Sequence, residues 1–472
     1  MHAMDMNWNL KRVLRVVGGR LLCGPGDMRF DGIGTDSRTI RPGRLFVALR
    51  GERFDAHQFI GQVVAKGVCG AVVEASQLRD ADLDAMDAKG VACIAVADTT
   101  RALGALAAHQ RRRVDIPVVA ITGSNGKTTT RRMTDHVMAQ GYNTLTTRCN
   151  FNNEVGVPLT LFNLGVQHRA AVLELGMNHA GEINRLAAIC RPTIGLITNV
   201  GPAHLEFLHS LEGVARAKGE LLAHIADGGH AVLNLDDDHV AALAASASCP
   251  VTFFGLSAEA HIRAQAVCAT DQGVAFDLVM PSGRTRIQLK TPGRFMVLNA
   301  LAAAAVGHLV GLRARQIRAG LEAFIPENGR LQVMQTAAGL NIIDDTYNAN
   351  PASMMAAIDT FAGKREWDQG YLVLGDMLEL GAQAPALHTS VGRCAARAKP
   401  AGIYAYGDFA ADLISGAQAA GMSAGNLFSG DKQAIAADLA GKIAPGDWVL
   451  VKGSRGMAME TVVEALQAAS GP

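Results

Sequence analysis

A glycine-rich segment with one lysine and a run of threonines is the part of the sequence best suited to phosphate chemistry. Residues 121–130 read Ile-Thr-Gly-Ser-Asn-Gly-Lys-Thr-Thr-Thr. Glycines let backbone N–H groups surround a phosphate, Lys127 can reach the β- and γ-phosphates, and Thr128 offers a hydroxyl to Mg²⁺. The generic pattern has glycine where this chain has Ile121, and the alternative is an ordinary strand–helix turn with an exposed lysine. Because the preceding strand, the glycines, Lys127 and Thr128 agree, we predict a nucleotide site. The chain has no Asn-Lys dipeptide, so the usual guanine-reading element is missing and a GTPase switch is disfavoured.

Other polar residues stand at or near the ends of apolar segments, where ligands collect in parallel α/β sheets. Glu174 lies inside an apolar strand, where Mg²⁺ or a neighbouring Lys or Arg would compensate its charge. His204 follows another strand and is either a ligand or an ordinary surface or capping residue. Lys218 and Glu220 lie on the next helix, whose ordinary interpretation is a solvated face.

A polar loop ends an apolar strand much later in the chain. Residues 344–351 read Asp-Asp-Thr-Tyr-Asn-Ala-Asn-Pro. Two carboxylates, two amides and a proline suit a turn with a helix cap, and they suit a ligand contact equally well. The sequence leaves both interpretations open.

The elements that position these residues alternate between strands and helices. Apolar strands are expected at 117–122, 171–175, 194–200 and 231–235, with helices at 127–140 and 211–225. A second series has strands at 340–343, 371–374, 403–406 and 448–451, with helices at 384–398 and 432–443. Short strands are expected earlier, at 45–49, 71–73 and 94–96. The pattern predicts an α/β protein with mostly parallel sheets.

Length and composition agree with this fold class. The 472 residues correspond to about three domains of roughly 150 residues. We place them at 1–112, 113–327 and 328–472, with turn-forming residues at the second boundary. Hydrophobic residues make up 49% and the formal charge is +1, which excludes a disordered chain and argues against a dedicated nucleic-acid binder.

Targeting signals and cysteine patterns are missing from the sequence. The most apolar stretch, residues 300–312, is shorter than the ~20 residues that span a bilayer, and no signal-peptide core is visible. The eight cysteines are far apart, with no pair at metal-binding or redox spacing. We therefore expect reduced thiols and a cytoplasmic protein.

Taken together, these segments resemble the Mur ligase family over nearly the whole chain. The phosphate loop matches the family's Thr-Gly-x-x-Gly-Lys-[Ser/Thr] pattern at Thr122–Thr128, which explains the mismatch at Ile121. Five further matches follow in the expected order: residues 150–158, 174–177, 344–351, 374–381 and 451–455. In the first domain, residues 36–38 and 42–57 also resemble the family.

The resemblance implies a three-domain enzyme of cell-wall precursor synthesis. A small α/β N-terminal domain would hold the UDP end of the substrate, a central parallel-sheet domain would bind ATP, and a Rossmann-like C-terminal domain would complete the ligase. The implied reaction adds D-alanyl-D-alanine to UDP-N-acetylmuramoyl-tripeptide through an acyl phosphate, releasing ADP and phosphate. We expect a monomer.

The resemblance also implies roles for particular residues. Residues expected to contact ATP are Gly123, Ser124, Asn125, Gly126, Lys127, Thr128, Thr129, Asn299, Arg330, Asp345, Tyr347 and Asn348. Thr128 and Glu174 would hold one Mg²⁺, and His204 with an N-carboxylated Lys218 would hold a second. Lys127, Lys218, His204 and Arg330 are the expected catalytic residues.

The implied substrate contacts come from all three domains: Asp36, Ser37, Arg38, Arg53, Phe54, Asp55, Asn152, Asn153, Lys452, Ser454 and Arg455. Phe295 stands where relatives commonly have histidine. Two alternatives stay open. One is another amide ligase of the superfamily, such as the diaminopimelate-adding enzyme or a folylpolyglutamate synthase, although the Asp-Asn-Pro-Arg element of the former is missing. The other is a nucleotide-gated binding module without chemistry.

Overall fold

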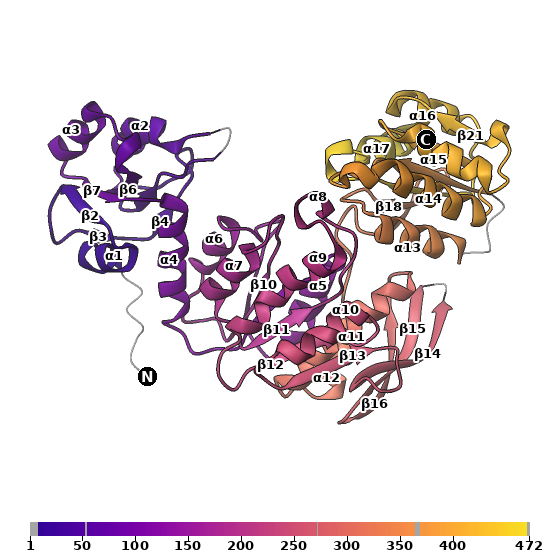
Figure 1. Ribbon diagram of the computed structural model, residues 1–472, viewed down its shortest axis with the longest axis horizontal. Helices are drawn as coiled ribbons and strands as arrows, with labels where there is room; N and C mark the ends of the chain where they lie inside the picture. The colour runs from indigo at the N-terminus through magenta and orange to yellow at the C-terminus, as the bar shows by residue number, and fades with distance from the viewer. Residues whose placement is uncertain (1–7, 52–53, 271, 364–368, 470–472) are drawn as a thin grey trace.

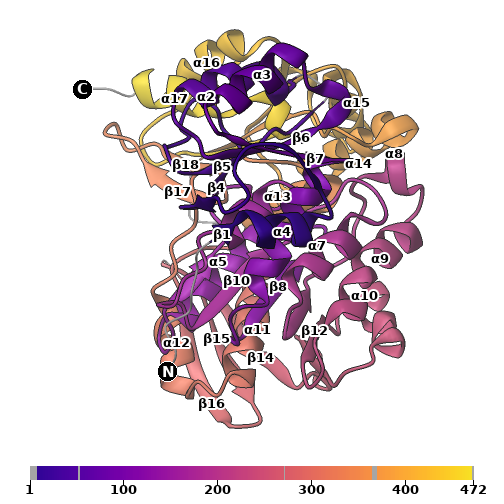
Figure 2. The same ribbon diagram turned by 90° about the vertical axis from the view of Figure 1, so that its left-hand side faces the viewer.

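The structure is a computed structural model that describes residues 8–51, 54–270, 272–363 and 369–469. Its elements gather into three groups, coloured from indigo to yellow along the chain in Figure 1. The first and last groups both lie above the central group, at its two ends in Figure 1 and one in front of the other in Figure 2. Each group has its own main sheet, which confirms the expected α/β fold. The exact boundaries at 112/113 and 327/328 stay a prediction.

The first group has a five-stranded sheet in the order β2-β7-β6-β5-β4. Its strands are β2 (Arg20–Cys23), β4 (Ile33–Gly34), β5 (Leu45–Val47), β6 (Gly70–Glu74) and β7 (Ala92–Val96), and a separate pair joins β1 (Trp8–Asn9) to β3 (Arg29–Phe30). Its helices are α1 (Leu10–Val17), α2 (Ile60–Ala65), α3 (Asp80–Ala88) and α4 (Thr99–Arg111). Helix α4 packs on two helices of the central group, α6 (Gly156–Leu161) and α7 (Glu182–Cys190), and so links the two groups.

The central sheet has nine strands in the order β16-β15-β14-β13-β12-β11-β8-β10-β9. Its parallel strands are β8 (Val118–Thr122), β9 (Thr144–Thr146), β10 (Ala170–Glu174), β11 (Ile194–Ile197), β12 (His230–Asn234) and β13 (Val251–Gly255). All five residues of β8 are buried, as expected for a strand with neighbours on both sides. The chain continues from β8 to β9 and β10 on one side and then to β11 on the other. This reversal of strand order brings the carboxyl ends of β8, β10 and β11 to one crevice, where open α/β sheets bind ligands.

An antiparallel extension of this sheet was not predicted. Strands β14 (Ile262–Thr270), β15 (Gly273–Met280) and β16 (Gly283–Leu289) form a meander in which β14 also pairs in parallel with β13. Exposed and buried residues partly alternate in β16, which shows a strand with one solvated face rather than the continuous apolar run that predicts a buried strand.

The remaining central helices cover the sheet and include the most apolar stretch. They are α5 (Lys127–Met138), α8 (Leu205–Leu208), α9 (Leu211–Gly219), α10 (Asp238–Ala242), α11 (Arg294–Leu309) and α12 (Ala314–Glu322). Residues 300–306 of α11 are completely buried, and α11 packs against α5 and the sheet. Within the described residues, no helix combines the length and apolar character needed to cross a membrane.

The last group has a six-stranded sheet in the order β17-β18-β22-β19-β20-β21. Its strands are β17 (Gln332–Gln335), β18 (Asn341–Asp345), β19 (Gly370–Gly375), β20 (Gly402–Tyr406), β21 (Leu427–Ser429) and β22 (Trp448–Lys452). Its helices are α13 (Pro351–Ala362), α14 (Ala384–Arg397), α15 (Ala410–Ala419), α16 (Lys432–Ala440) and α17 (Glu460–Ala469). All pairings are parallel except the one between β17 and β18, so the second doubly wound unit forms as expected.

The helix expected over 211–225 is interrupted, and the ordinary interpretation of a solvated face does not hold for Lys218. Helix α9 ends at Gly219, and a 3₁₀ helix covers Glu220–His224. The Glu220 carboxylate accepts hydrogen bonds from the backbone N–H groups of Gly181 and Asn184 at 2.8 and 2.9 Å, so it caps α7. Lys218 is 2% exposed.

Close packing between α14 and α15 depends on two glycines. A Cβ atom at Gly392 would lie 1.9 Å from the Leu413 carbonyl oxygen, and one at Gly416 would lie 2.0 Å from the Thr389 carbonyl oxygen. Because the obstacle is backbone, we expect Gly392→Ala to lower the free energy of unfolding by about 2 kcal/mol. Urea unfolding followed by circular dichroism measures this. Gly425→Ala is the control, because its Cβ would meet nothing closer than 4.0 Å. Equal midpoints for the two variants would contradict this packing.

Candidate active site

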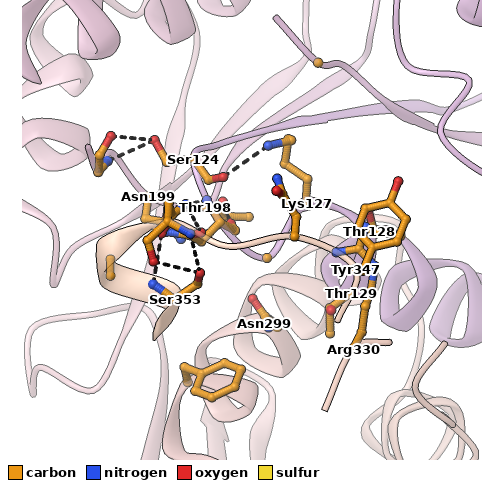
Figure 3. A pocket seen from close by; sticks show the side chains of 18 of the residues that line it. Ser124, Lys127, Thr128, Thr129, Thr198, Asn199, Asn299, Arg330, Tyr347 and Ser353 are labelled. Carbon is orange, nitrogen blue, oxygen red and sulfur yellow. Dashed lines mark hydrogen bonds between the residues drawn. The ribbon is translucent and has the colours of Figure 1, made fainter. Parts of the chain in front are cut away.

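A cavity of about 660 Å³ opens at the crevice formed by the strand ends of the central sheet. It is lined by the loop between β8 and α5, the residues that follow β10 and β11, the start of α11, and the segment between β18 and α13. The last two groups of elements therefore share this cavity. Figure 3 shows Thr198 and Asn199 on one side of Lys127, and Arg330 with Tyr347 on the other.

The glycine-rich loop has the shape that phosphate binding requires. Gly126 precedes α5 at φ 76°, and a Cβ there would lie 2.5 Å from Oδ1 of Asn299. The Asn125 N–H donates to Oδ1 of Asn199 at 2.8 Å, and the Ser124 N–H donates to the Asn199 carbonyl at 2.9 Å. The loop is therefore fixed by the residue that follows β11, with the start of α5 facing the cavity.

The Lys127 ammonium folds back over this loop. It donates to the carbonyl oxygens of Gly123 at 2.7 Å and Ser124 at 3.2 Å, and the second bond is drawn in Figure 3. Burial lowers the pKa of Lys127, the Glu174 charge opposes that shift, and Arg330 adds to it. Its hydrogen-bond partners are neutral, so its positive charge remains available to a phosphate.

Glu174 at the end of β10 combines the two interpretations left open by the sequence. It is 2% exposed, and its Oε1 accepts a hydrogen bond from Nδ2 of Asn152 at 2.9 Å. Its Oε2 lies 3.4 Å from Nε of Arg131, yet both atoms are buried without a hydrogen-bond partner. A buried carboxylate oxygen without a partner fits an Mg²⁺ ligand, and Thr128 lines the same cavity. Within the described residues, no group of three or more His, Cys, Asp or Glu side chains could hold a metal ion.

Arg131 joins this carboxylate to the segment that leads into the last group. It is 3% exposed and donates from Nη1 to the Thr147 carbonyl at 2.5 Å and from Nη2 to Oε1 of Glu327 at 3.2 Å. Arg132, the next residue, also reaches Glu327 at 3.5 Å, but its side chain is 27% exposed.

Removal of the Arg131 side chain leaves the buried carboxylate of Glu174 without its ion-pair partner. We expect Arg131→Met to lower the free energy of unfolding by about 3 kcal/mol, because Glu174 then has no compensating guanidinium. Arg132→Met is the matched control and should cost only about 0.5 kcal/mol, because its ion pair is partly solvated. Chemical denaturation of both variants measures the difference. Similar losses for both would contradict a buried role for Arg131.

The two residues expected at a second metal have different surroundings. His204 lines the cavity, and its Nδ1 lies 2.8 Å from Oε2 of Glu379 in the last group. This contact lowers the pKa of Glu379. Lys218 is buried and is not among the residues that line the cavity, and no hydrogen bond or ion pair of its Nζ is found within the described part of the chain. Burial holds the pKa of Lys218 well below its ordinary value, with a smaller contribution from the charge of Lys127.

Residues from α11 and from the segment between α12 and β17 line the cavity beside the glycine-rich loop. Oδ1 of Asn299 accepts from the Thr130 hydroxyl at 3.1 Å. The Arg330 guanidinium lies over the Tyr347 ring, 3.8 Å from its centroid. Phe295 also lines the cavity. All predicted ATP-contacting residues except Gly123 lie in the lining.

The polar loop at 344–351 is both a turn and part of the cavity. Asn350 caps α13 by accepting from the Ser353 N–H at 2.9 Å, and its Nδ2 donates to Oδ1 of Asn125 at 2.6 Å. Burial raises the pKa of Asp345, while Lys452, 2.5 Å away, opposes the shift. The last group therefore touches the phosphate loop directly.

The predicted substrate residues do not all come together. Asn152, Asn153, Lys452 and Arg455 line the cavity. The Lys452 ammonium donates hydrogen bonds to the Asp345 carboxylate and the Asn348 carbonyl. The Ser454 hydroxyl donates to the Ala349 carbonyl at 3.2 Å.

The first-group residues lie away from the cavity. Asp36, Ser37, Arg38, Phe54 and Asp55 are not among its lining residues, and Arg53 lies outside the described residues. Phe54 is 77% exposed, and Arg38 pairs with Asp36, whose pKa it lowers to about 2.

Several cavity residues were not predicted. They include Thr198, Asn199, Asn234 and Ser353. Asn199 follows strand β11, so its place at a strand end could have identified it. Arg131 could have been found from its spacing of four residues from Lys127, which puts both on one face of α5.

Comparisons with known proteins agree with the three groups of elements. Family models match consecutive parts of the chain: Mur ligase family, catalytic domain (residues 29–111), Mur ligase middle domain (121–307) and Mur ligase, glutamate ligase domain (329–455). UDP-N-acetylmuramoyl-tripeptide--D-alanyl-D-alanine ligase of Escherichia coli (strain K12) is 41% identical over 93% of this chain and 94% of its own.

Two solved structures have the same overall fold. Crystal structure I of MurF from Acinetobacter baumannii has a TM-score of 0.89 at 35% identity and covers 98% of this chain and 99% of its own. MurF ligase from Thermotoga maritima in complex with ADP has a TM-score of 0.82 at 25% identity, covering 93% of this chain and 97% of its own.

Proposed function

The chain belongs to the Mur ligase family, and from that premise we propose how its cavity carries out the amide-forming reaction. The protein is an ATP-dependent ligase that adds D-alanyl-D-alanine to UDP-N-acetylmuramoyl-tripeptide in peptidoglycan precursor synthesis. The observation that carries this conclusion is the 41% identity to a ligase of that name over 93% of the chain. The cavity is the site proposed for this reaction, because residues of the phosphate loop and of the last group both line it.

We propose that the ATP phosphates bind across the loop formed by residues 123–129. The start of α5 and Lys127 would face the β- and γ-phosphates, and Asn299 would contact the nucleotide from α11. Arg330, held over Tyr347, would reach the γ-phosphate from the segment between α12 and β17. Asp345, Tyr347 and Asn348 would meet the nucleotide from the last domain.

We propose two Mg²⁺ sites in this cavity. Oε2 of Glu174, which has no hydrogen-bond partner, and the hydroxyl of Thr128 would hold one ion, and His204 with an N-carboxylated Lys218 would hold the other. When bound, Mg²⁺ neutralises charge on the phosphates and on the substrate carboxylate. The lowered pKa of Lys218 supports its carboxylation, because a neutral amine can take up CO₂ and become an anionic oxygen ligand.

We propose that the terminal carboxylate of the tripeptide attacks the γ-phosphorus of ATP. An acyl phosphate and ADP form, so the carboxylate gains a good leaving group. The amine of D-alanyl-D-alanine then attacks the acyl carbon, and phosphate leaves with formation of the amide. Lys127 and Arg330 stabilise the negative charge that two approaching anions bring together. Contact of the last domain with the phosphate loop would exclude water from the acyl phosphate.

We propose that the other ends of the substrates bind outside the phosphate site. Asp36, Ser37, Arg38, Arg53, Phe54 and Asp55 would hold the UDP end, and Asn152, Asn153, Lys452, Ser454 and Arg455 would contact the peptide parts. The division of labour would follow domains 1–112, 113–327 and 328–472. We further propose a cytoplasmic monomer, and the eight free cysteines support a reducing compartment.

The amine acceptor separates this function from its rivals. Purified protein, ATP, Mg²⁺ and UDP-N-acetylmuramoyl-tripeptide are incubated with D-alanyl-D-alanine or with meso-diaminopimelate, and phosphate release is followed. We expect release with D-alanyl-D-alanine alone. Release with diaminopimelate would indicate the sibling ligase, and nucleotide binding without release under either condition would indicate a binding module.

A further inference from the structure

One contact between the central and last groups involves a residue of the proposed second metal site. Nδ1 of His204 lies 2.8 Å from Oε2 of Glu379. His204 directly precedes α8, which faces the last group in Figures 1 and 2. Gly381, two residues after Glu379, lies against Glu206 of α8, because a Cβ there would be 3.8 Å from the Glu206 Cβ. Glu379 of the last group therefore contacts a cavity-lining residue of the central group.

Both residues of this contact have a backbone conformation that side-chain-bearing residues rarely adopt. The φ angle is 56° at His204 and 62° at Glu379. Such a conformation is strained and persists only where the surroundings of the residue hold it. The His204 carbonyl accepts from the N–H groups of Phe207 and Leu208 at 3.1 and 3.0 Å, which fixes one side of the contact.

The segment that carries Glu379 is fixed just as firmly. The Met377 N–H donates to Nε2 of His388 at 2.9 Å, and His388 is completely buried. The Leu378 N–H donates to the Ser454 hydroxyl at 2.9 Å. The two residues before Glu379 are thus tied to the interior of the last domain, so the position of its carboxylate follows the position of that domain.

The Nδ1 atom of the His204 ring lies beside a carboxylate of the last group. Nδ1 is buried, and within the described residues no acceptor is aligned with it for a hydrogen bond. The charged group beside it is the Glu379 carboxylate, 2.8 Å away. A carboxylate beside Nδ1 favours the tautomer with the proton there. That tautomer leaves the lone pair on Nε2, and histidines that bind metals commonly have such a carboxylate partner.

We propose that Glu379 is a positioning residue that orients His204 for metal binding through Nε2, so that docking of the last domain completes the second metal site. The inference rests on the proposed function, because it takes His204 as a ligand. It adds that the ligand is ready only while the last domain lies against α8. Binding of the second metal and domain docking then stabilise each other, since each favours the same arrangement.

The test measures metal binding rather than turnover. Mn²⁺ binding to the full chain with ADP is followed by electron paramagnetic resonance for the wild type, Glu379→Ala, His204→Ala and the double variant. We expect two sites in the wild type, with one weakened about 10- to 100-fold by Glu379→Ala. The double variant should bind Mn²⁺ as His204→Ala does. Glu206→Ala is the matched control, since it removes a carboxylate from the same interface without touching His204.

Wild-type affinity in Glu379→Ala, or a further loss in the double variant, would overturn the inference. Histidine ¹⁵N spectra of the metal-free protein give an independent readout, with the His204 signal assigned from His204→Ala. The wild type should have the proton on Nδ1, and a wild-type His204 tautomer in folded Glu379→Ala would also overturn it. If the wild-type protein ligates D-alanyl-D-alanine but His204→Ala binds Mn²⁺ as the wild type does, the inference fails and the proposed function stands. If it does not ligate, the proposed function fails.

Discussion

Lys127→Ala should lower the rate of phosphate release by about 10³-fold, because the variant removes a positive charge aimed at the transferring phosphoryl group. The ammonium now rests on the carbonyls of Gly123 and Ser124, and its pKa is lowered by burial. No neighbouring side chain of the loop carries a charge that could replace it. Steady-state kinetics with saturating UDP-N-acetylmuramoyl-tripeptide and D-alanyl-D-alanine measure the loss.

Binding of the UDP substrate separates catalysis from misfolding in this experiment. The segments proposed for the UDP end lie in the first domain, away from the cavity, so calorimetry should give an unchanged Kd for Lys127→Ala. Lys11→Ala, on the exposed surface of α1, is the control for loss of a lysine elsewhere. An equal loss of UDP-substrate binding and ligation would indicate misfolding. Wild-type phosphate release by the folded variant would show that Lys127 has no role in the reaction.

Lys218→Ala should lower ligation by about 10²-fold or more, and formate should restore part of the activity. Lys218 is buried, has no described partner, and has a pKa well below its ordinary value. Its amine is therefore neutral at a lower pH than that of a free lysine, which is the state that reacts with CO₂. A small carboxylate in the vacated space would replace the lost oxygen ligand in part.

Carboxylation also has a direct signature. Wild-type protein with ¹³C-bicarbonate should give a carbamate signal that is missing in Lys218→Ala and that falls as the pH drops through the lowered pKa, because protonation removes the reactive amine. Arg216→Ala, on the exposed face of the same helix, should retain both the signal and the activity. Wild-type turnover by Lys218→Ala would eliminate this assignment.

The sequence was sufficient where one strand or loop determines its own structure. Strands β8, β10 and β12 lie within about one residue of their predicted bounds, because runs of buried apolar residues have few alternatives. The phosphate loop was recognisable because its glycines, Lys127 and Thr128 act within a few residues of one another. In contrast, strands β14 and β16 of the meander each contain several exposed residues, so their signal was weaker than that of the buried strands.

Contacts between distant segments could not be read from the sequence. Glu379 and His204 are far apart along the chain, and only the placement of the last domain on α8 brings them together. Arg131 and Arg132 are the same residue type on the same helix, yet one is buried against Glu174 and the other is partly solvated. The spacing of residues in α5 indicates that Arg131 lies on the same face of the helix as Lys127. It does not indicate the carboxylate partner of Arg131, because Glu174 comes from β10.

The central claim is that the cavity activates a carboxylate by phosphoryl transfer before the amide forms. The most direct test uses UDP-N-acetylmuramoyl-tripeptide labelled with ¹⁸O in its terminal carboxylate, followed by mass spectrometry of the released phosphate after a complete reaction with ATP and D-alanyl-D-alanine. Our account predicts one ¹⁸O atom in each phosphate, because the acyl phosphate carries a carboxylate oxygen away with its leaving group. Unlabelled phosphate, or label in AMP, would contradict it.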